Sequence, residues 1–155
     1  MKIIGIDPGL VATGFAVIAY DGVQIRVLDS GEIMPNKKAE LAVRLGTIYD
    51  RLCAVIEMTK PDVMIIEKVY SHPKFPQTAV LLGHARAVAF VAAHRFGIKV
   101  AEVEASVAKR SLTGSGRASK TQMLRMATHM AGGQTMSSEH AADALALAVT
   151  YAYKA

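Results

Sequence analysis

Three short apolar segments open the chain, and polar or turn residues separate them. Residues 2–7 (KIIGID) and 13–19 (TGFAVIA) have the apolar character of buried strands, and apolar and polar residues alternate over 24–33. Because the connections between the three segments are short, the strands are expected to pair as two antiparallel hairpins.

Helical and strand patterns alternate over the rest of the chain. Apolar residues recur at helical spacing over 38–58, and Lys60-Pro61 ends that pattern. The further elements expected are a strand over 62–69, a helix over 77–95, a strand over 97–103, and helices over about 104–112, 119–131 and 138–152. This order predicts an α/β fold: one domain over residues 1–155, with a five-stranded mixed sheet flanked by helices.

The charge distribution indicates an anionic partner. The net charge is +5, and residues 68–138 hold ten Lys or Arg but only two acids, Glu102 and Glu104. Protein surfaces usually mix the two signs, so such a one-sided stretch favours nucleic acid, although an ordinary basic surface has the same composition.

The location of the protein is also constrained by composition. The single cysteine, Cys53, excludes an intramolecular disulfide and fits a reducing compartment. The apolar stretch at the N-terminus is too short for a signal peptide, and no run of apolar residues is long enough to predict a membrane span. We therefore expect a cytoplasmic protein.

Acidic residues end two of the predicted strands. Asp7 ends the first, and Pro8-Gly9 suits the central positions of a type II turn, with Gly9 at positive φ. Glu67 follows the apolar run VMII in the fourth. Each acid alone could be a turn residue or a strand end that emerges into water. If the first and fourth strands are neighbours, both acids lie at one sheet edge, where α/β proteins bind ligands.

The last predicted helix supplies further candidate ligands. Ser137 or Ser138 can cap it, and His140 and Asp143, spaced i and i+3, share one face. Glu139 shares a face with Asp143 as well, and it remains an alternative ligand to His140. Acids here also fit the positive end of the helix dipole.

Clustering of these acids would favour a cation. Two carboxylates about 4 Å apart repel by roughly 4 kcal/mol at an effective dielectric constant near 20. Carboxylates suit Mg²⁺ or Mn²⁺, and an imidazole ligand shifts the preference toward Mn²⁺. We therefore expect a metal site for phosphoryl transfer, with these ligands: Asp7, Glu67, His140 and Asp143.

Basic and aromatic residues are candidates for contacts with DNA. Lys120 begins a predicted helix that Ser119 can cap, where its charge opposes the helix dipole; a bound phosphate would explain this, as would an exposed lysine tolerated at small cost. Phe75 can stack on an unpaired base or pack beneath its loop. The other predicted contacts are Tyr70, Lys74, Lys109, Arg110 and Arg117.

Five blocks of the chain, in order, resemble the RuvC family of Holliday-junction resolvases: GIDPGxxxTGFAVI, IIEKVY, LLGHARAVA, VAKRSLTGSGRASK and EHAADALALAV. The resemblance spans residue 3 to about 152. It implies an RNase H-like fold and a homodimer, for which the apolar helix 77–95 is a candidate interface. It also implies paired nicks in four-way DNA junctions during recombination and repair, with 5′-phosphate products. Two Mg²⁺ ions per site, replaceable by Mn²⁺, and a branch-migration helicase as partner of a cellular member are implied too.

The same resemblance assigns roles to single residues. Asp7, Glu67 and Asp143 match the family's catalytic acids, and His140 falls where many members carry aspartate and some carry histidine. Three further residues match functional positions of the family: Lys109, Lys120 and the aromatic Tyr70 near the junction centre.

The loop after Glu67 departs from the family pattern. Family members commonly show an Asn and a Ser in this loop, whereas here it contains two prolines, and Ala87 replaces a usual glycine. These departures fit a divergent branch, such as a phage-encoded one, and they leave the substrate preference open.

Three other function classes compete with a resolvase. An actin-like kinase or ATPase has a similar first loop, but it needs a second lobe for which 155 residues leave no room. A non-catalytic module that grips branched DNA would keep the basic stretch. A nuclease of the same fold could act on forks, flaps or RNA hybrids.

Overall fold

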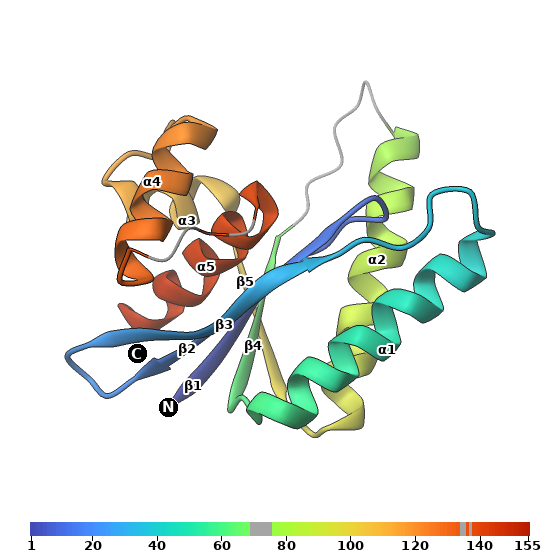
Figure 1. Ribbon diagram of the computed structural model, residues 1–155, viewed down its shortest axis with the longest axis horizontal. Helices are drawn as coiled ribbons and strands as arrows, with labels where there is room; N and C mark the ends of the chain where they lie inside the picture. The colour runs from blue at the N-terminus through green and yellow to red at the C-terminus, as the bar shows by residue number, and fades with distance from the viewer. Residues whose placement is uncertain (69–75, 134–135, 137) are drawn as a thin grey trace.

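The computed structural model describes residues 1–68, 76–133, 136 and 138–155. They form five strands and five helices in the order predicted (Figure 1). The strands are β1 (Lys2–Asp7), β2 (Thr13–Tyr20), β3 (Ile25–Ile33), β4 (Val63–Glu67) and β5 (Lys99–Val103). The helices are α1 (Leu41–Thr59), α2 (Pro76–Arg95), α3 (Ala105–Thr113), α4 (Lys120–Met130) and α5 (Glu139–Ala152).

The five strands form one sheet in the order β3-β2-β1-β4-β5. β1 pairs antiparallel with β2, and β2 with β3, so the two predicted hairpins are confirmed. β4 runs parallel to β1 and β5 parallel to β4. The predicted mixed sheet is therefore confirmed, and β1 lies at its centre.

Helices cover both faces of the sheet (Figure 1). α3, α4 and α5 pack on one face over alternate strand residues such as Ile3, Ile18 and Ile65. α1 and α2 pack on the other face over the intervening residues, including Ile4 and Ile66. β4 is buried on both faces, which explains why its sequence is apolar throughout rather than alternating.

Local signals set the helix ends. α1 stops at Lys60, which is in the left-handed conformation and precedes Pro61. Ser119 and Gln122 form a capping box at the start of α4, and Ser138 accepts a hydrogen bond from the Ala141 N–H at the start of α5. No helix in the described part of the chain is long and apolar enough to cross a membrane.

The predicted type II turn after Asp7 is wrong. Gly9 is not among the glycines with positive φ, and residues 8–12 form an irregular loop. Gly9 is needed for a different reason, because a Cβ there would overlap the carbonyl oxygen of Ala12. The Thr13 hydroxyl donates to the Gly9 carbonyl at 2.8 Å and closes the loop.

Candidate active site

Asp7 and Glu67 emerge side by side at the carboxyl ends of two central parallel strands. Ile6 of β1 is in register with Ile66 of β4, so the acid that follows each of them lies at the same sheet edge. The expectation that the first and fourth strands are neighbours is thereby confirmed. The rigid strands position both carboxylates at this edge, where α/β proteins bind ligands.

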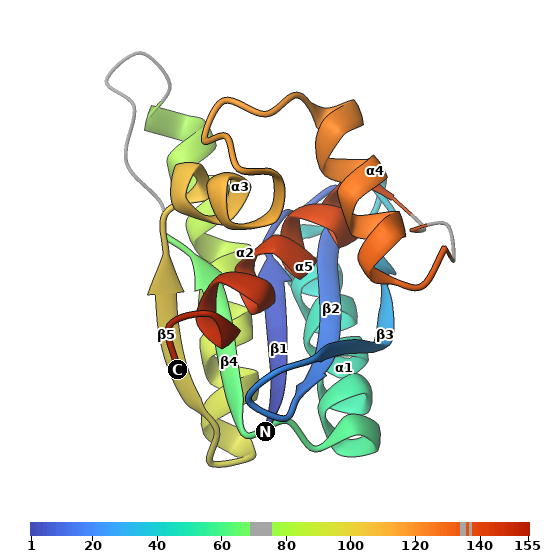
Figure 2. The same ribbon diagram turned by 90° about the vertical axis from the view of Figure 1, so that its left-hand side faces the viewer.

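Two glycines let α5 approach this edge closely. A Cβ at Gly5 would overlap the Ala144 carbonyl oxygen, and one at Gly14 would overlap the His140 carbonyl oxygen. Gly14 is the register partner of Asp7. Figure 2 shows α5 crossing the sheet over β1 and β2. The first turn of α5 is therefore held over Asp7, with Asp143 one turn along the helix.

His140 contacts Asp7 directly. Its Nδ1 lies 2.8 Å from Asp7 Oδ2, and the Asp7 side chain is only 16% exposed. Burial raises the pKa of the Asp7 carboxyl, whereas the hydrogen bond and the charge of His140 lower it. The structure thus brings Asp7 at the end of β1 into contact with His140 at the start of α5.

Glu67 and Asp143 complete an acidic cluster. Burial first, and then the charges of Asp7 and Asp143, raise the pKa of Glu67 to about 7. Burial and the charge of Asp7 also raise the pKa of Asp143. Since each carboxylate disfavours ionisation of its neighbours, the cluster holds negative charge that a cation would stabilise.

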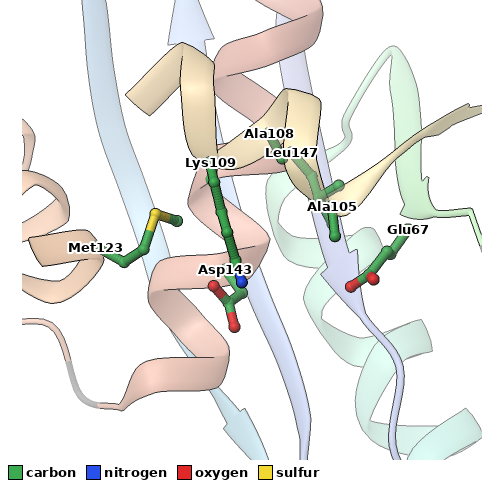
Figure 3. A pocket seen from close by; sticks show the side chains of 8 residues that line it. Glu67, Ala105, Ala108, Lys109, Met123, Asp143 and Leu147 are labelled. Atoms are coloured by element: carbon green, nitrogen blue, oxygen red, sulfur yellow. The ribbon is translucent and has the colours of Figure 1, made fainter. Parts of the chain in front are cut away.

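Lys109 extends from α3 toward these acids. It lines a cavity of about 80 Å³ together with Glu67 and Asp143, and its ammonium points toward Asp143 (Figure 3). Its charge lowers the pKa values of both acids, against the dominant effect of burial. The structure thus places Lys109, which the sequence predicted as a contact with DNA, beside the acid cluster.

Lys120 lies at the N-terminus of α4 and reaches the start of α5. Its Nζ lies 2.7 Å from Glu139 Oε2, and both side chains are exposed. This contact raises the pKa of Lys120. Glu139, considered in the sequence as an alternative ligand, binds Lys120 in the structure, while His140 faces Asp7.

The other predicted DNA contacts are further from the acids. Arg110 on α3 and Arg117 in the loop before α4 are exposed and do not line the cavity beside Glu67. Tyr70, Lys74 and Phe75 lie outside the described residues.

The donor set fits a hard divalent cation, although its present arrangement is not that of a coordination sphere. In residues 1–68, 76–133, 136 and 138–155, no group of three His, Cys, Asp or Glu side chains is placed to hold one ion. The Asp7–His140 hydrogen bond engages one oxygen of the Asp7 carboxylate. Carboxylates and imidazole are nevertheless ligands that Mg²⁺ and Mn²⁺ accept. Asp7 Oδ1 and His140 Nε2 take no part in this bond, so either residue could still offer a donor atom to an ion.

One residue at the site edge was missed in the sequence. Arg86 of α2 donates from Nη1 to the Glu67 carbonyl oxygen at 2.6 Å and forms an ion pair with Glu102. The only signal in the sequence is a single arginine within the apolar stretch LLGHARAVAF. An arginine on an apolar helix is ambiguous, because it can equally point into solvent.

Comparisons with known proteins agree with this geometry. Residues 3–151 match the model of the family described as crossover junction endodeoxyribonuclease RuvC. The chain is 40% identical over 153 residues to the RuvC of Burkholderia cenocepacia, covering 99% of this chain and 84% of the relative. It is 38% identical over 151 residues to the RuvC of Caulobacter vibrioides, covering 97% and 89%.

A solved structure also matches closely. Thermus thermophilus RuvC in complex with a Holliday junction substrate superimposes with a TM-score of 0.89 at 28% identity, covering 99% of this chain and 94% of that one. All three similar proteins are bacterial, so the comparisons do not support the phage origin that the divergent loop suggested. The chain belongs to the RuvC family of crossover junction endodeoxyribonucleases.

Proposed function

We propose that this protein hydrolyses phosphodiester bonds in four-way DNA junctions at the cluster of Asp7, Glu67 and Asp143. The observation that carries the proposal is the convergence of three carboxylates from β1, β4 and α5, each with a raised pKa, beside Lys109. The likeness to a relative solved with a Holliday junction supports this substrate.

The proposed cofactor is a pair of Mg²⁺ ions, for which Mn²⁺ substitutes. RuvC proteins are generally metal-dependent, and the four proposed ligands are Asp7, Glu67, His140 and Asp143. When bound, such ions neutralise charge on the phosphate oxygens and lower the pKa of water. The carboxylates must be ionised to bind these ions. Burial and mutual repulsion disfavour the ionised form in the metal-free protein, and a bound cation would offset both effects.

The basic residues are proposed to bind and orient the phosphate backbone. Lys109 faces the acids from α3 and can stabilise negative charge that develops on the scissile phosphate. Lys120 stands at a helix N-terminus, where its ammonium and the free N–H groups of α4 can receive a phosphate. Additional proposed contacts with DNA are Tyr70, Lys74, Phe75, Arg110 and Arg117.

A homodimer is the proposed assembly. Val80, Leu81 and Val91 expose apolar side chains on α2, the helix expected to form the interface. A two-fold dimer would place two identical sites on the near two-fold four-way junction, which suits paired nicks. Sedimentation at micromolar concentration tests this assembly, and a monomer would contradict it. A branch-migration helicase remains a proposed partner.

Two further proposals concern the extent of the domain and the location of the protein. Two cores on opposite faces of one sheet support a single nuclease domain over residues 1–155. The free Cys53 is consistent with the proposed cytoplasmic location.

A nicking assay tests the proposed function. End-labelled four-way junctions, forks and plain duplex are incubated with the protein in Mg²⁺, Mn²⁺ or EDTA. We expect symmetric paired nicks in the junction only with a metal, with 5′-phosphate ends, and none from the Asp7→Asn variant, which should still bind junctions. Equal cutting of forks would indicate a broader nuclease, and binding without nicks would indicate a non-catalytic module.

A further inference from the structure

Arg86 joins the carboxyl ends of β4 and β5 beside the proposed cation site. Its Nη1 donates a 2.6 Å hydrogen bond to the main-chain carbonyl oxygen of Glu67, and its Nη2 pairs with Glu102 of β5. The Arg86 side chain is only 17% exposed. A partly buried arginine with two directed contacts is held in a defined position.

Packing of α2 fixes the guanidinium further. The Arg86 Cζ lies 5.0 Å from the centroid of the Phe90 ring, one turn along α2. Ala85 and Ala89, which flank Arg86 on α2, are fully buried in the core on this face of the sheet, and α2 contacts β5. The helix therefore brings this side chain within reach of the strand ends.

The peptide between Glu67 and Lys68 is restrained at both of its polar groups. Arg86 binds its carbonyl oxygen, and its N–H donates at 2.8 Å to the carbonyl oxygen of Val103 in β5. Since the peptide is planar, fixing both groups fixes the ψ angle of Glu67. That angle fixes the direction in which the Glu67 side chain leaves the backbone.

We propose that Arg86 is a positioning residue that aims the Glu67 carboxylate at the proposed cation site. This inference rests on the proposed function. Arg86 acts through the backbone of Glu67 and does not contact the substrate, because its two terminal nitrogens are engaged by the Glu67 carbonyl and by Glu102. Glu102 neutralises its charge and holds it in place.

Binding of Mn²⁺ to the DNA-free protein, followed by electron paramagnetic resonance, tests this role without cleavage. We expect Arg86→Met to weaken Mn²⁺ binding by about 10- to 100-fold, as outer-sphere residues of metal sites typically do. Cleavage should need correspondingly more metal, while junction affinity in EDTA should stay near that of the wild type. Arg95→Met removes the same charge from the same helix, where Arg95 contacts Tyr49, and should leave all three properties unchanged.

Two more conservative variants test the positioning role of Arg86 if Arg86→Met does not fold. Arg86→Lys cannot reach both partners with one point charge, so we expect a smaller loss of Mn²⁺ affinity in the same direction. Glu102→Gln keeps the size of the side chain but removes the ion pair, with the same expectation. Adding Glu102→Gln to Arg86→Lys should weaken binding less than the two separate effects combined, because the residues act as a unit.

Particular results would overturn the proposal. If Arg86→Lys and Glu102→Gln bind Mn²⁺ as the wild type does, Arg86 does not position Glu67. If Arg86→Met instead weakens junction binding in EDTA at unchanged Mn²⁺ affinity, Arg86 is a phosphate contact. Glu67→Gln separates the two proposals. If Glu67→Gln binds Mn²⁺ as the wild type does, the proposed cation site itself is wrong. If Glu67→Gln weakens Mn²⁺ binding but the Arg86 and Glu102 variants do not, only the role of Arg86 fails.

Discussion

Gly14 of β2 lies directly beneath the backbone of His140 in α5, so closely that a Cβ at position 14 would overlap the His140 carbonyl oxygen. Gly14 is also the register partner of Asp7. One glycine therefore sets the distance between α5 and the strand that carries Asp7. Its importance is steric, since it is not among the glycines with positive φ.

Gly14→Ala should displace the start of α5 and separate His140 from Asp7. We expect cleavage to fall at least tenfold, and the free energy of unfolding to fall by about 1–3 kcal/mol, the usual effect of overpacking. Urea unfolding and junction cleavage measure the two effects. Gly46→Ala in α1 is the control, because no atom outside the adjoining turns of α1 lies within 4 Å of a Cβ there. If Gly14→Ala cleaved as the wild type does, close helix packing would not position this site.

The convergence of Asp7 and Glu67 was predictable because it depends on regular patterns. Apolar runs identified the two strands, each ends in an acid, and parallel neighbours bring their carboxyl ends to one edge. His140 and Asp143 followed from helical spacing on a capped helix. Local periodicity and the order of elements identified these four residues as candidates, with Glu139 left open as an alternative to His140.

Contacts that depend on close approach could not be predicted. Gly5 and Gly14 are unremarkable in strand sequences, and only the packed helix shows why a side chain is excluded there. Gly9 looked like a residue for positive φ, but the Ala12 carbonyl requires it instead. Arg86 binds the main chain of a residue on another element, and such a contact places no demand on the partner's side chain.

The raised pKa of Glu67 predicts a pH-dependent stability in the absence of divalent metal. Folding raises this pKa from 4.5 to about 7, so the folded protein holds a proton that the unfolded chain releases. The resulting stability is complete below pH 4.5 and is lost as the pH rises through about 7. Asp7 and Asp143 contribute in the same direction, since their pKa values are also raised.

Glu67→Gln, which stays neutral, should therefore be more stable than the wild type at pH 8. We expect a gain of about 1–2 kcal/mol, discounted for partial exposure, and little difference at pH 4.5. Urea unfolding in EDTA across this range measures it, with Glu57→Gln on the exposed side of α1 as the control. A destabilised Glu67→Gln protein at pH 8 would show that the carboxylate is well stabilised without metal.

His140→Asp should change the metal preference. The substitution replaces an imidazole by a carboxylate, a ligand that favours Mg²⁺ relative to Mn²⁺. It also removes the hydrogen bond that lowers the pKa of Asp7. We expect the ratio of cleavage rates in Mg²⁺ and Mn²⁺ to rise severalfold, whereas the same change at the exposed His129 on α4 should not alter it. An unchanged ratio for His140→Asp would argue that residue 140 does not bind the metal.

Lys120 and Glu139 should respond differently to substitution, although they form one ion pair. Both side chains are exposed, so the pair contributes little to stability and its loss should not unfold the protein. If Lys120 binds the DNA phosphate, Lys120→Met removes a charge from the reaction and should lower cleavage by about 10²-fold or more. Glu139→Gln leaves Lys120 in place and should keep most of the activity and the full Mn²⁺ affinity. Junction cleavage at saturating protein and Mn²⁺ binding to free protein measure both variants. The opposite pattern, with Glu139→Gln losing Mn²⁺ and Lys120→Met cleaving normally, would make Glu139 the fourth metal ligand and leave Lys120 outside the reaction.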